Sequence, residues 1–138
     1  MISPYNAGYR IPFPMLTVTL HTDESAVGPL SALLDTGADF TLIPTPLLEQ
    51  IEAAGVGQVR IQTHFGDSHL VTQYTVAVQV HQTGLLWIYA IGDDEGNEVI
   101  LGRDVLNKLP LFLDGPQRQT QLLDAATVKR LRARRPRA

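Results

Sequence analysis

An apolar segment that ends in an Asp-Thr-Gly turn is the feature of this sequence that most constrains its fold. Residues 29–34 are largely apolar and lead directly into Asp35, Thr36 and Gly37. Two carboxyl groups held about 3 Å apart share one proton, and can therefore act as base and acid in one reaction. The sequence has one such turn. Asp35 therefore either meets its own copy across a two-fold axis or takes no part in acid–base chemistry.

The rest of the sequence has the pattern of a mainly β protein, because short apolar segments alternate with turn residues. Residues 59–80 are expected to form a long hairpin that turns at 64–68, since Val76, Val78 and Val80 alternate with less apolar neighbours. The other predicted strands cover residues 15–20, 29–34, 40–43, 85–91, 99–102, 109–114 and 120–123.

Two short helices are expected between these strands. The first covers residues 47–54 and is opened by prolines, and the second covers residues 103–108. Trp87 lies in an apolar run and is predicted to be a core residue. We find no internal repeat and no second domain, and 138 residues are too few for a two-lobed enzyme.

Composition excludes several kinds of site. The chain has no cysteine, which removes thiol catalysis, thiolate metal sites and disulfides. Its four histidines lack metal-binding spacing and it has no glycine-rich phosphate loop, so neither a metal nor a cofactor is expected. The N-terminus lacks the features of a signal peptide, and no apolar run is long enough to span a membrane. The sequence is therefore interpreted as that of a soluble, cytoplasmic protein.

Charge is distributed unevenly along the chain. Six of the eleven basic residues lie within residues 129–137, whereas residues 1–128 contain five basic and fourteen acidic residues, a net charge of −9. A basic end segment can contact nucleic acid or an anionic membrane, or it can be a solvated, frayed terminus, which is the simpler interpretation. We treat residues 1–123 as the folded domain, which is not expected to bind nucleic acid, and residues 124–138 as a basic tail.

Three separated segments carry a family resemblance. Leu-Leu-Asp-Thr-Gly-Ala-Asp at 33–39 ends an apolar strand, Val-Ile-Leu-Gly-Arg-Asp-Val-Leu at 99–106 leads from a strand through a glycine into a helix, and the long hairpin lies between them. In this order they resemble the catalytic turn, the second signature and the flap of the retroviral-type (retropepsin-like) aspartic peptidases, in the single-lobed homodimeric branch that includes bacterial members. The resemblance covers roughly residues 15–123. It implies a mainly β, closed-barrel acid protease fold with one or two short helices and a flap hairpin.

The resemblance implies a role for each residue of the catalytic turn. Asp35 would supply one carboxylate of a dyad formed across a homodimer. It would activate a water for attack on a peptide carbonyl, while the partner subunit's Asp35 protonates the carbonyl oxygen. Thr36, Gly37 and Ala38 would support the turn, with the Thr36 hydroxyl bonded to the other subunit.

Other residues would support the turn from a distance or bind substrate. Asp39 and Arg103 would form an ion pair that braces the turn against the second helix, and a partly buried pair would be costly to break from one side. The flap tip would close over an extended peptide by β-type pairing. The implied substrate-binding residues are Leu33, Phe40, His64, Phe65, Gly66 and Ile100. For Leu33, Phe40 and Ile100, ordinary core packing is the competing interpretation.

Two functions remain open at this point. The first is an aspartic endopeptidase that cleaves an extended polypeptide. The alternative is a catalytically silent module that dimerises and binds peptide or protein partners. The intact Asp-Thr-Gly favours the enzyme, because a binding module has no need of that carboxylate. The single glycine at the flap tip and the continuation of the chain through residues 109–116 keep the alternative open.

Overall fold

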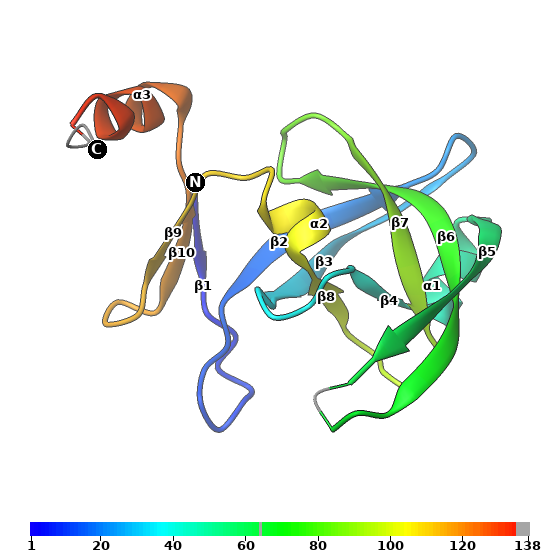
Figure 1. The fold of residues 1–138 in the computed structure, drawn as a ribbon. Coiled ribbons are helices and arrows are strands. Elements are labelled where there is room, and N and C mark those ends of the chain that lie inside the picture. Colours follow the sequence, from blue (N-terminus) through cyan, green and yellow to red (C-terminus); the bar gives the residue numbers. More distant parts are fainter. Residues whose placement is uncertain (64, 135–138) are drawn as a thin grey trace.

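The computed structural model describes residues 1–63 and 65–134, which form ten strands and three helices (Figure 1). The strands are β1 (Ile2–Pro4), β2 (Met15–His21), β3 (Ala26–Leu34), β4 (Leu42–Pro44), β5 (Ala54–Gln62), β6 (Ser68–Val80), β7 (Leu86–Asp93), β8 (Val99–Leu101), β9 (Leu111–Asp114) and β10 (Gln119–Leu122). The helices are α1 (Thr45–Gln50), α2 (Arg103–Leu106) and α3 (Ala125–Ala133).

Seven strands form the larger sheet, in the order β2-β3-β8-β4-β7-β6-β5. Because β2 also pairs with β6, six of these strands close into a barrel. The sequence of β2 shows why the barrel has an apolar interior: Leu16, Val18 and Leu20 alternate with partly exposed residues and are buried in the core. The predicted mainly β, closed-barrel fold is confirmed.

The long predicted hairpin is also confirmed. β5 and β6 pair antiparallel from Ala54 and Thr75 out to Gln62 and Ser68, and extend beyond the barrel. Thr63 donates its N–H to the carbonyl oxygen of Asp67 at 2.8 Å, which closes the loop at the tip. His64, which was expected at this tip, lies outside the described residues.

The chain ends form a separate three-stranded sheet, the terminal sheet, in the order β1-β10-β9. It lies to one side of the barrel (Figure 1). Ser3 of β1 and Thr120 of β10 pair in register, and both are buried. Leu122 belongs to the same core cluster as the barrel residues, so this face of the terminal sheet packs on the barrel.

Two expectations about local structure are wrong. Trp87 has 45% of its surface exposed, because it points outward from β7 between the inward-facing Leu86 and Ile88. The first helix ends at Gln50, since Ala54 already begins a strand.

The chain also has a third helix within the described residues, α3, which lies in the segment described above as a basic tail. The Asp124 side chain caps this helix by accepting the Thr127 N–H at 2.7 Å. That hydrogen bond lowers the pKa of Asp124 below its ordinary value. No helix in residues 1–63 and 65–134 is long and apolar enough to cross a membrane.

His81 links the terminal sheet to the barrel and should make stability depend on pH. Its Nε2 lies 3.3 Å from the Ser3 hydroxyl oxygen. Partial burial, assisted by the Met1 ammonium, lowers the pKa of His81 below 6.5. Between that lowered pKa and 6.5 the unfolded chain binds more protons than the folded one, so stability falls as the pH drops through this window.

We therefore expect His81→Asn to flatten the loss of thermal midpoint between about pH 7.5 and 5, a range set by the ordinary histidine pKa. Asn also tolerates the left-handed backbone at this position, where φ is 52°. Thermal midpoints of both proteins across the range test this. An equal slope in the two proteins would contradict it.

Candidate active site

The Asp35 turn is held by backbone hydrogen bonds at the end of β3. The Asp35 N–H donates to the Leu101 carbonyl at 2.9 Å, which ties the turn to the neighbouring strand β8. Asp35 Oδ1 accepts the Gly37 N–H at 2.9 Å, and the Ala38 N–H donates to the Asp35 carbonyl at 3.2 Å. The Asp35 side chain is therefore fixed by the turn that carries it. Asp35 is half-buried, while Thr36 and Gly37 are exposed.

A buried polar network that the sequence analysis missed supports this turn from behind. Thr41 is fully buried, and its hydroxyl donates to Asp104 Oδ1 at 2.7 Å. The Thr41 N–H donates to Asp104 Oδ2 at 3.0 Å, and the Gly102 N–H donates to the Thr41 hydroxyl oxygen at 3.1 Å. These bonds join the loop after Asp35 to the start of α2, and they satisfy groups that would be costly to bury unpaired. The sequence did contain a signal for this network: Thr41 follows shortly after the Asp35 turn, and Asp104 lies in the first turn of the second predicted helix.

Gly102, at the start of α2, lies close to the backbone of the loop after Asp35. A Cβ atom at this position would lie 2.6 Å from the carbonyl carbon and oxygen of Phe40 and 2.9 Å from the Ala38 carbonyl oxygen. All three are backbone atoms, so the loop itself would have to shift. The glycine is therefore required by packing at the site.

We expect Gly102→Ala to lower the free energy of unfolding by about 1–3 kcal/mol, the usual cost of overpacking, and to displace the loop after Asp35. Gly84→Ala is the matched control, because a Cβ there meets no atom within 4 Å. Denaturant unfolding of both variants measures the difference. Equal stability of the two variants would contradict the proposed crowding.

Arg103 forms the ion pair with Asp39 that the family resemblance implied. The Arg103 Nη1 also donates to the Thr36 carbonyl oxygen at 2.7 Å. The backbone N–H of Arg103 donates to the Ala38 carbonyl oxygen at 2.9 Å. However, the side chains are 41% and 72% exposed for Arg103 and Asp39, so this pair is largely solvated. A large cost of breaking the pair was expected only if the pair were partly buried. Because both side chains are well exposed, that cost should be small.

Arg103→Ala should accordingly cost about 1 kcal/mol or less of stability, as exposed pairs do. Lost positioning of the Thr36 carbonyl should affect activity more than stability. The thermal midpoint and kcat/KM of the variant, compared with those of Arg103→Lys, separate the two effects. A loss of several kcal/mol would show that the pair is effectively buried.

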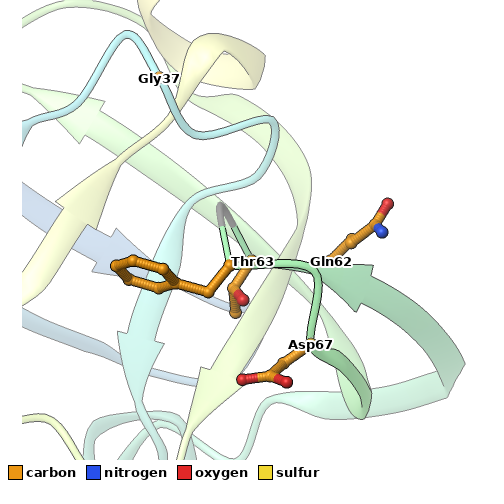
Figure 2. A pocket seen from close by; sticks show the side chains of 5 residues that line it. Gly37, Gln62, Thr63 and Asp67 are labelled. Atoms are coloured by element: carbon orange, nitrogen blue, oxygen red, sulfur yellow. The ribbon is translucent and has the colours of Figure 1, made fainter.

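Two clefts meet at Gly37, beneath the hairpin of β5 and β6. One has a volume of about 560 Å³ and is lined by Gly37 and by the flap residues Gln62, Thr63, Phe65 and Asp67 (Figure 2). The second, of about 460 Å³, is lined by residues of the Asp35 loop, of β4, of β5 and of β7: Gly37, Ala38, Asp39, Phe40, Leu42, Arg60, Ile61, Gln62 and Ile91. An extended chain could therefore lie between the hairpin and the turn.

The predicted substrate-binding residues do not all reach these clefts. Phe40 lines the cleft of about 460 Å³. Phe65, which is 94% exposed, lines the cleft of about 560 Å³ at the hairpin tip. Gly66 adopts a left-handed backbone with φ of 86° in the tip loop. Leu33 is 4% exposed and borders a different cavity, and its β8 neighbour Ile100 lines neither cleft.

The chain belongs to the retroviral aspartyl protease family, whose model matches residues 12–114, well over half of its length. Two solved structures share its fold. The EIAV protease complexed with the inhibitor HBY-793 is 22% identical with a TM-score of 0.54, over 77% of this chain and 93% of that one. A retropepsin-like aspartic protease from the bacterium Rickettsia conorii is 12% identical with a TM-score of 0.58, over 88% of each chain. No curated protein matches the sequence.

Proposed function

We propose that this protein is an aspartic endopeptidase whose active site forms when the Asp35 turns of two copies meet at a two-fold axis. The observation that carries the proposal is the Asp35 turn itself. Its carboxylate is fixed by the Gly37 N–H, and the turn lies beside two clefts that the hairpin overhangs. Family membership supports an acid–base role for this residue.

In this proposal the two Asp35 carboxyl groups share one proton. The ionised one accepts a proton from a bound water as the water oxygen attacks the peptide carbonyl carbon. The protonated one gives its proton to the carbonyl oxygen, which yields a neutral gem-diol. In the breakdown of the gem-diol, the protonated carboxyl group gives its proton to the leaving nitrogen while the ionised one takes a proton from a gem-diol hydroxyl. The carbonyl re-forms, the C–N bond breaks, and the carboxyl pair again holds one proton.

The substrate would be an extended polypeptide. β5 and β6 present backbone groups near the tip, and a peptide strand that passes between the hairpin and the Asp35 turn could pair with them. The clefts on either side of Gly37 would then receive successive side chains. We retain a cytoplasmic location as part of the proposal, to be tested by cell fractionation.

The test is cleavage of a diverse peptide library by the purified chain, with products identified by mass spectrometry. Peptides in which a hydroxyl-bearing isostere replaces the scissile amide resemble the gem-diol and should inhibit. Binding of library peptides without any cleavage would instead support the silent binding module.

A further inference from the structure

Helix α3 concentrates positive charge and has no acidic side chain. Its second half and its C-cap hold four basic side chains, all exposed: Lys129, Arg130, Arg132 and Arg134. Within the described residues the only ion pair is Arg103–Asp39, so none of the four is paired with a carboxylate. Basic residues at this end of a helix interact favourably with its dipole, but their side chains remain available to an external anion.

These basic side chains lie on two flanks of α3. Successive helical residues are rotated by about 100° around the helix axis, so Lys129 and Arg132 lie about 60° apart on one flank. Arg130 and Arg134 lie about 40° apart on the other flank. The helix therefore presents positive charge to both sides at once.

The face between the two flanks is formed by small side chains and is turned to solvent. It carries Ala126 and Ala133, both of which are exposed. Thr127 and Val128, the half-buried side chains of the helix, lie on the opposite face. α3 stands apart from the barrel, beyond the terminal sheet (Figure 1). A large partner can therefore approach the alanine face closely without touching the barrel.

The density and arrangement of these charges match those of a DNA duplex. At a rise of about 1.5 Å per residue, the four charges span about 7.5 Å, or one charge per about 2 Å of helix axis. Duplex DNA carries one phosphate charge per about 1.7 Å. Its major groove admits an α-helix. Because phosphates line both edges of the groove, both flanks of α3 can contact them at the same time.

Two other anionic partners fit less well. A flat anionic membrane would meet one basic flank and would require a bulky apolar face, for which α3 offers only Val128 and Leu131. The acidic loop at 93–98 of a second copy is the other choice. There the Asp93 and Asp94 carboxylates already accept hydrogen bonds from within their own chain, so they are partly neutralised.

We infer that α3 binds duplex DNA through its phosphates, with the alanine face in the major groove and the basic flanks toward the phosphates on either side. Arginine suits this role because its guanidinium group binds phosphate oxygens in pairs. Residues 1–128 carry a net charge of −9, which repels DNA and confines the contact to the basic end of the helix. Binding of DNA in this way does not depend on the proposed peptidase activity.

Fluorescence anisotropy of a labelled DNA duplex, titrated with the full chain at several salt concentrations, tests this contact. Four phosphate contacts give log K against log salt a slope of about −3.6. Arg130→Gln combined with Arg134→Gln removes two of the four charges. It should weaken binding about tenfold or more at low salt and reduce the slope to about −1.8. Arg10→Gln combined with Lys108→Gln is the matched control, because it removes the same charge from exposed positions outside α3 and should leave both values unchanged.

The other flank provides a second pair of substitutions. Lys129→Gln combined with Arg132→Gln should weaken DNA binding to a similar extent, because each flank contacts one edge of the groove. Circular dichroism and the thermal midpoint should be the same in all the double variants, and peptide cleavage should be unaffected in them.

Several results would overturn the inference. Equal weakening of DNA binding by the control and by the α3 variants would reflect the overall charge of the chain. An RNA duplex of the same length that binds as tightly would rule out seating in the groove, because its major groove is too narrow for a helix. Binding to phosphatidylserine vesicles, or self-association through α3, in a chain that does not bind DNA would assign the helix to a membrane or to a second copy instead.

Discussion

Asp35→Asn is expected to abolish peptide cleavage, with kcat/KM falling by about 10³-fold or more, as when other acid–base groups that act as a unit are removed. The amide cannot accept the proton of the attacking water. It can still accept the Gly37 N–H that Asp35 Oδ1 accepts at 2.9 Å, so the turn should keep its conformation. Thermal midpoint and dimer dissociation constant should therefore remain close to those of the wild-type protein.

Asp23→Asn is the matched control for this substitution. It makes the same change at an exposed residue between β2 and β3, at the opposite end of β3 from the Asp35 turn, and should retain full activity. Undiminished cleavage by Asp35→Asn would show that Asp35 is not a catalytic carboxylate. Loss of activity together with unfolding would point to a structural role for its hydrogen bond.

Activity per chain should fall steeply on dilution, because each chain supplies one Asp35. Well below the dimer dissociation constant, the rate should vary with the square of the chain concentration, since mass action then sets the amount of dimer. Assays across several decades of concentration, with dimer content measured in parallel, test this. A rate strictly proportional to concentration in a monomeric sample would contradict the shared dyad.

Mixing provides an independent form of the same test. If wild-type and Asp35→Asn chains exchange freely in equal amounts, random pairing leaves about one quarter of the dimers with two carboxylates. Activity per wild-type chain should then be about half that of the undiluted wild-type protein at the same total concentration. A mixture that loses no activity per wild-type chain would show that one Asp35 is sufficient.

Local sequence signals were strong enough to predict most of the barrel. Leu16, Val18 and Leu20 alternate with polar or partly exposed neighbours, which identifies a strand with one buried face whatever surrounds it. The long alternating run that became β5 and β6 predicted the hairpin for the same reason. Asp35, Thr36 and Gly37 marked the candidate site because an Asp-Thr-Gly sequence directly after an apolar strand is typical of a tight turn that carries a carboxylate.

Contacts between distant segments could not be predicted in the same way. Trp87 is apolar, but whether a strand residue faces the core depends on the register of its neighbours, and in β7 that register turns it outward. The Thr41–Asp104 hydrogen bonds join residues 63 positions apart in the chain. Thr41 alone carries no sign of its partner.

The sequence by itself thus determined a mainly β chain with a single carboxylate on a glycine turn, because periodicity and turn chemistry are local. The tertiary structure decided how that turn is held and what lies around it. It placed Gly102 against the Phe40 backbone, left the Asp39–Arg103 pair largely solvated and paired β1 with β10 of the same chain. Each of these depends on closure of the barrel and on strand order, which bring together residues that no local pattern relates.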